Sequence, residues 1–141
     1  MPLVRCLYAS RIAQGSTAGV IDAIVQESRR RNVESGVTGL LCCTADTFIQ
    51  VLEGGRDEVC DLYNAIVRDP RHREVRLLTY EEISERRFGN WSMGLVNVNA
   101  INPALLLKYG KRAVLDPFAT SGKATMSLLE ELLATGAIGT R

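Results

Sequence analysis

Residues 47–55, TFIQVLEGG, alternate like a half-buried strand, and the alternation places a polar side chain where a hydrophobic one is expected. Alternate side chains of a strand point to opposite faces, so Phe48, Gln50 and Leu52 share one face. A glutamine carries a hydrogen-bond donor and an acceptor, and it can exchange them by rotating or by tautomerising. Gln50 therefore predicts a polar partner on this apolar face, which is backbone, another side chain or a ligand.

Two further positions show the same conflict between a polar residue and an apolar face. Ile24, Ser28 and Asn32 are four residues apart, so on a helix they form one stripe that changes from apolar to polar. Tyr8 ends the apolar face of the first expected strand. A helix end in solvent, or a buried polar group bonded to backbone, would explain each one separately. Together with Gln50 they indicate a cavity with apolar walls and a few hydrogen bonds, which suits a small planar ligand with polar edges.

Hydrophobic periodicity predicts the elements that position these residues. The expected strands are residues 2–8, 36–43, 47–54, 74–83 and 91–99. The expected helices are residues 16–32, 56–69, 102–110 and 125–136. We expect Ser16 or Thr17 to cap the first helix and Gly36 to follow its end, Pro70 to end the second helix, and Gly136 to end the last. The short polar turn 44–46 is typical of a hairpin.

This order of elements predicts a fold of the α+β class. Strand, helix, two strands, helix and two strands suit a ferredoxin-like βαββαββ sandwich, with a five-stranded mixed sheet and two helices on one face. Ile49 and Val51 make the other sheet face apolar as well. We expect the C-terminal helices to cover that face, so that residues 1–97 form the ligand-binding domain and residues 98–141 a helical extension packed on the sheet.

Composition argues against several classes of function. The chain has 141 residues and a net charge of +1, which gives no reason to expect nucleic acid or an anionic membrane as a partner. No apolar run approaches the roughly 20 residues needed to cross a bilayer, and the N-terminus lacks a signal-peptide pattern, so we expect a cytoplasmic location. The four cysteines show no C-x-x-C spacing and the chain has one histidine, so no metal site is expected.

Five stretches of the sequence resemble the BLUF family, blue-light sensors that use flavin. They are LYASR, SRRRNVESGVTGLL, FIQVLEG, DPRH and RRFGNWSMG, in family order, and the resemblance extends from about residue 3 to residue 95. The resemblance implies FAD, with FMN or riboflavin as alternatives, held non-covalently between two helices. It also implies a photoreceptor and not an enzyme, which signals to a protein partner of unknown identity or through a homo-oligomer.

The resemblance also implies roles for individual residues. Tyr8 matches the photoactive tyrosine that passes an electron to the excited flavin, and Gln50 matches the switching glutamine beside it. Asn32 matches the asparagine that bonds the carbonyl and nitrogen edge of the ring. Trp91 and Met93 match the strand that changes between dark and lit states. The remaining residues expected at the cofactor are Ile24, Ser28, Arg31, Phe48, Ile66, Asp69, Arg71 and His72.

Three other functions are compatible with parts of this pattern. The first is a small redox enzyme that uses flavin, although no nicotinamide motif is present. The second is a binding module that has kept the fold and lost the flavin. The third is a light sensor that forms a cysteine–flavin bond, although the asparagine-cysteine-arginine signature expected of such sensors is absent from this sequence.

Overall fold

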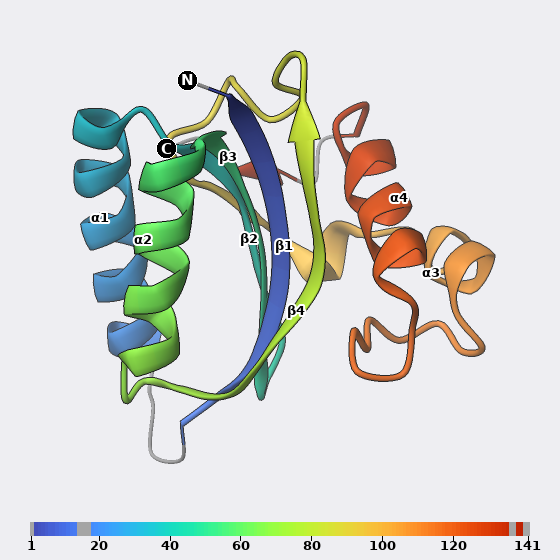
Figure 1. Cartoon of the computed structure of the whole chain (residues 1–141). Helices are drawn as coiled ribbons and strands as arrows, with labels where there is room; N and C mark the ends of the chain where they lie inside the picture. Colours follow the sequence, from blue (N-terminus) through green and yellow to red (C-terminus); the bar gives the residue numbers. More distant parts are fainter. Residues whose placement is uncertain (1, 14–17, 136–137, 140–141) are drawn as a thin grey trace.

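A mixed β-sheet forms the middle layer of the fold in the computed structural model, which describes residues 2–13, 18–135 and 138–139 (Figure 1). Within these residues the sheet has six strands in the order β4-β1-β3-β2-β5-β6. Neighbouring strands are antiparallel except for β2 and β5, which are parallel. The strands are β1 (Leu3–Ile12), β2 (Thr38–Cys43), β3 (Thr47–Gly55), β4 (His72–Ile83), β5 (Gly94–Val96) and β6 (Ile138–Gly139).

Helices lie on both faces of this sheet (Figure 1). One face carries α1 (Ala18–Ser35) and α2 (Arg56–Arg68). The other carries α3 (Pro103–Tyr109) and α4 (Gly122–Leu132), which follow a short 3-10 helix, η1 (Val98–Ala100). The predicted α+β sandwich is confirmed, including the C-terminal helices on the second face. The domain boundary at residue 97 stays a prediction.

Local sequence signals account for the two helices of the first face. The stripe of α2 buries Val59, Leu62 and Ile66 against the sheet, as its periodicity predicts. Gly36 follows α1 with a φ of 73°, a left-handed conformation that glycine adopts without a steric penalty. That turn lets the Val37 N–H donate to a carbonyl at the end of α1 before the chain enters β2. The expected caps of this helix, at positions 16 and 17, lie outside the described residues.

Strand β3 divides the interior into two cores, because its side chains from residue 47 to residue 54 are all buried. The first core lies between the sheet and helices α1 and α2, and includes Tyr8, Ile24, Phe48, Leu52, Ile66 and Met93. The second core lies between the sheet and α4, and includes Leu7, Ile49, Val51, Phe88, Met126, Leu129 and Leu132. The apolar residues predicted at the cofactor therefore belong to the first core, and the C-terminal extension contributes to the second.

The structure differs from the prediction mainly after β4. A strand was expected over residues 91–99, but β5 contains only Gly94–Val96. The strand ends there because the Asn97 side chain accepts from the Asn99 N–H at 3.1 Å and caps η1. Trp91 therefore precedes the strand. The two-residue strand β6 was not predicted, and the expected helix stop at position 136 lies outside the described residues.

Candidate functional site

The candidate site is a cavity between α1 and α2, above the sheet. Nine of the residues expected at the cofactor line it, namely Tyr8, Ile24, Ser28, Arg31, Gln50, Ile66, Asp69, Arg71 and His72. Glu27, Leu41 and Ala65 also line it and were not predicted. Glu27 is adjacent to Ser28 on α1, and Ala65 is adjacent to Ile66 on α2. These two residues could therefore have been predicted as neighbours of expected site residues on the same helix.

Tyr8 and Gln50 form the polar centre of the site. They are directly opposite each other in the antiparallel pairing of β1 with β3, so the sheet register itself brings their side chains together. The Tyr8 hydroxyl donates to Gln50 Oε1, and both side chains are buried. Burial raises the pKa of Tyr8 well above its usual value, so the phenol is neutral at physiological pH.

Met93 continues this chain of contacts on the far side of the glutamine. Gln50 Nε2 lies 3.2 Å from Met93 Sδ, which accepts its N–H. Met93 is fully buried in the first core, whereas Trp91, two residues earlier, packs against the second core. The sequence left the placement of the tryptophan open. The structure places it on the opposite side of the sheet from Gln50, so of this pair only Met93 contacts the glutamine.

Asn32 provides the test of whether the site suits a flavin ring. Its side chain is buried, and Nδ2 donates to the Ser92 carbonyl at 2.7 Å. Asn32 Oδ1 is buried with no hydrogen-bond partner among the described residues. Such an orphan acceptor is rare because burial without a partner is costly. An N–H on the edge of a planar heterocycle would satisfy it, and the apolar side chains of Ile24 and Ile66 would face the ring, so the residues fit the expected group.

Charged residues gather at the opening of the cavity. Arg71 Nη2 lies 2.7 Å from Asp69 Oδ2 and 3.1 Å from Glu27 Oε2, so α1 and the end of α2 are joined there. The hydrogen bonds from Arg71 lower the pKa of Asp69, which is therefore ionised at neutral pH. Arg31 is exposed on α1 and lines the same opening. The polar end of a bound cofactor would meet these two guanidinium groups.

His72 and Phe48 support the wall of the site. His72 is 8% exposed, its Nδ1 lies 2.8 Å from Ser10 Oγ, and its ring centroid is 4.7 Å from that of Phe48. Burial lowers the pKa of His72, so the imidazole is neutral at pH 7. Phe48 is fully buried in the first core in contact with His72. Three residues expected at the cofactor are not among those that line the cavity, namely Asn32, Phe48 and Met93.

The cysteines do not contribute to the lining of the cavity. All four are free thiols. Burial raises the pKa of Cys6 and of Cys43 to about 12, so each is a protonated, weakly nucleophilic thiol. Among the described residues, no group of three or more His, Cys, Asp or Glu side chains is placed to hold a metal ion. The described helices include none with the length and apolar character of a membrane span.

Comparison with known proteins identifies a family that uses a planar heterocyclic cofactor, in agreement with the cavity described above. A family model described as BLUF, sensors of blue-light using FAD, matches residues 3–94. The chain is 35% identical over 96 residues to the blue light- and temperature-regulated antirepressor BluF of Escherichia coli (strain K12), which is 68% of this chain and 24% of that protein. The chain thus spans about a quarter of the length of that relative.

Two solved structures resemble nearly the whole chain. BlrB, a BLUF protein in its dark state, is 33% identical with a TM-score of 0.80, over 94% of this chain and 96% of that one. BlsA in its photo-activated state is 28% identical with a TM-score of 0.82, over 96% of this chain and 97% of that one. The match to the family model includes every residue that we place at the cavity. We conclude that the chain belongs to the BLUF family, the sensors of blue light that use FAD.

Proposed function

We propose that this chain signals blue light through a change of hydrogen bonds at Gln50, with no net chemical conversion. The observation that carries the proposal is the buried series Tyr8 Oη, Gln50 and Met93 Sδ, which begins at the wall of the cofactor cavity. FAD is the expected cofactor. Its ring would lie between Ile24 and Ile66, and its edge would meet Asn32.

The chemistry of the site starts at Tyr8. When bound, the flavin supplies the absorption of blue light and, while excited, takes up an electron. A phenol that gives up an electron becomes a strong acid, and the proton of Tyr8 already lies on a hydrogen bond to Gln50 Oε1. Gln50 is thus placed to receive that proton and to return it when the electron returns. Tyr8 ends as a neutral phenol again, so electrons and protons balance over the cycle.

The lasting change is in the amide of Gln50. In the structure Oε1 faces Tyr8 and Nε2 faces Met93. A glutamine rotated by half a turn presents Oε1 to Met93 Sδ instead, and a thioether has no proton to donate. The bond between Gln50 and Met93 is therefore lost after rotation, and residues 91–93 lose one of their attachments to the first core.

We further propose that this change reaches a protein partner or a second copy of the chain, and that the chain acts in the cytoplasm without enzymatic activity of its own. The support for a protein partner is the packing of α4 directly on the sheet face behind Gln50. A net charge of +1 offers no general attraction to nucleic acid. The known activity of the longer E. coli relative is a property of that protein.

The test of the proposed function is an absorption spectrum in the dark, after blue light, and during recovery in the dark. We expect a yellow protein whose oxidised-flavin band shifts to the red and then returns. Gln50→Leu should bind flavin without the shift, whereas Gln26→Leu, an exposed glutamine on α1, should behave as the parent chain. A bleached band would instead indicate flavin reduction or a cysteine adduct, and steady NADH oxidation would indicate a redox enzyme.

A further inference from the structure

Glu53 is a carboxylate buried in the second core, on the same strand as Gln50 but on the opposite face. Its exposed fraction is 0%, and a buried carboxylate persists only where other groups compensate its charge. Arg5 Nε lies 2.7 Å from Glu53 Oε2, and the two residues are directly opposite in the pairing of β1 with β3. The same pairing of strands thus produces the Tyr8–Gln50 contact on one face and the Arg5–Glu53 ion pair on the other.

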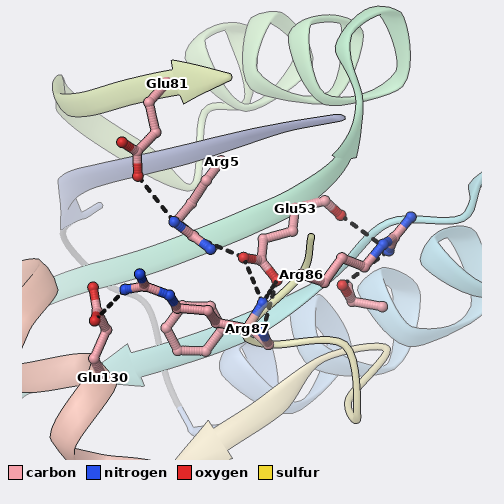
Figure 2. A network of polar contacts seen from close by, with 8 residues as sticks. Arg5, Glu53, Glu81, Arg86, Arg87 and Glu130 are labelled. Carbon is pink, nitrogen blue, oxygen red and sulfur yellow. Dashed lines mark hydrogen bonds and ion pairs between the residues drawn. The ribbon is translucent and has the colours of Figure 1, made fainter. Parts of the chain in front are cut away.

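The other ligands of this carboxylate come from the segment between β4 and β5. The backbone N–H of Phe88 donates to Glu53 Oε1 at 2.7 Å, and that of Arg87 donates to both oxygens at 3.1 Å (Figure 2). Arg86 adds a bond from Nη1 to Thr38 Oγ1 at 3.0 Å. Figure 2 shows the Arg5 side chain and the backbone of Arg87 meeting the Glu53 carboxylate, while the Arg87 side chain points to Glu130. Glu53 therefore fixes the middle of this segment to the centre of the sheet.

Gln50 and Glu53 hold the same segment at two points, from the two faces of β3. Glu53 holds it at Arg87 and Phe88, and Gln50 holds it at Met93. Building on the proposed function, we propose that Glu53 is a positioning residue of the light response. When the Gln50 bond to Met93 is lost, the Glu53 end stays fixed, and the displacement is confined to the residues from Gly89 to Met93.

The fixed end also leads to the C-terminal helix. Arg87 forms an ion pair with Glu130 of α4 (Figure 2). Phe88 is fully buried in the same core as Leu129 and Leu132 of that helix. Trp91, which lies between the two attachments and whose carbonyl accepts from the Gly39 N–H at 3.0 Å, packs against this core as well. The change at Gln50 therefore alters the packing of α4, because Trp91 is displaced relative to Phe88, which stays fixed.

The first test uses the unaltered, flavin-loaded chain and measures amide hydrogen exchange in the dark and under blue light. We expect the amides of Arg87 and Phe88 to have the same protection in both conditions. The region around Met93 and the helix α4 should differ between them. If the Phe88 amide loses protection in light, Glu53 is not a fixed point and the inference is wrong. A red shift without any change in α4 also overturns the inference, while leaving the proposed function intact.

The second test replaces the carboxylate. Glu53→Gln keeps the shape but has one acceptor oxygen and no charge, so it holds the segment weakly. We expect a normal red shift, because Gln50 lies on the other face, and a light–dark exchange difference in α4 reduced about 2- to 30-fold. The matched control is Glu81→Gln, which removes a carboxylate that also contacts Arg5, at 2.9 Å, but is 55% exposed at its side chain. That control should keep the full difference in α4.

A double variant separates positioning from simple charge balance. Arg5→Gln with Glu53→Gln removes both buried charges, so any loss of stability caused by an uncompensated Arg5 should be relieved. A positioning role predicts that the double variant folds and shifts to the red but still shows the reduced exchange difference in α4. A full light–dark difference in α4 in either Glu53 variant would refute the inference and reduce the ion pair to a structural role.

Discussion

Two tyrosines lie together beside the cavity, and replacing each in turn distinguishes the photoactive one. The rings of Tyr8 and Tyr63 are edge-to-face with centroids 5.9 Å apart, so both phenols are candidates for the electron donor. Only Tyr8 donates its hydroxyl proton to Gln50 in the described structure. Tyr8→Phe should therefore abolish the red shift while flavin still binds, because phenylalanine has no proton to give to the glutamine. Tyr63→Phe should leave the red shift unchanged.

The same pair of variants should differ in stability, by an amount that follows from burial. Tyr8 is 1% exposed and Gln50 4% exposed, so removing the hydroxyl deletes a buried hydrogen bond. The net loss is about 1–2 kcal/mol, because such a bond contributes about 1 kcal/mol and leaving Gln50 Oε1 unpaired adds to the cost. For a chain of this length that is a decrease in Tm of about 3–7 °C. Tyr63 is only partly buried, so its variant should stay within about 0.5 kcal/mol.

The assay is a urea unfolding curve in the dark, paired with a light-minus-dark absorption spectrum, for the parent chain and both variants. A full red shift in Tyr8→Phe would refute the assignment of the electron and proton donor. A red shift lost in Tyr63→Phe and kept in Tyr8→Phe would transfer the role to the residue on α2. Equal stability of the two variants would show that the hydroxyl of Tyr8 is not held as the structure has it.

Three further results are expected. Asn32→Ala should raise the Kd for flavin about tenfold in a titration of fluorescence quenching, because it removes the orphan oxygen that we propose as an acceptor for the ring edge. An unchanged Kd would place the ring elsewhere. Burial lowers the pKa of His72, so the unfolded chain binds a proton at this residue more readily than the folded chain does. The contribution of His72 to the free energy of unfolding should therefore be fully present above about pH 6.5 and fall as the pH drops through the folded-state pKa. In His72→Gln the urea midpoint should lose this dependence, and a midpoint that still fell equally would implicate carboxyl groups. Gly39→Ala should lower the free energy of unfolding by about 1–3 kcal/mol or more, because the new Cβ would lie 1.9 Å from the Val51 carbonyl oxygen. Gly89→Ala should unfold like the parent chain, because its Cβ would meet only a side chain, at 3.4 Å.

Much of the fold was predictable because it follows from local periodicity. The stripe of α2 and the hairpin of β2 and β3 need only neighbouring residues to be recognised. Strand alternation also predicted that Tyr8 and Gln50 lie on apolar faces. That they are directly opposite each other was not predictable from alternation, because the register of two strands depends on pairing over the whole sheet.

The features that were not predicted are the short β5, the position of Trp91 and the role of Glu53, and the last two depend on contacts between residues distant in the sequence. The brevity of β5 reflects the Asn97 cap of η1, and the placement of Trp91 reflects its packing against the second core. Glu53 was assigned to the second face from the alternation of β3, but no function was inferred for it. The available signal was a pair of opposite charges, Arg5 and Glu53, each placed among apolar residues on an expected strand.

The complete burial of β3 has a consequence for how the chain avoids misfolding. A slip by one residue moves every side chain of a strand to the opposite face, so a slip of β3 exchanges its two buried faces. Glu53 would then enter the first core, and Arg5 would be left buried without its counterion, at a cost of about 3–5 kcal/mol. Gln50 would at the same time be expelled to the second core. The register that gives the stable fold is therefore also the register that places Gln50 beside Tyr8. A chain with the slipped register would be too unstable to accumulate as a folded protein that cannot respond to light.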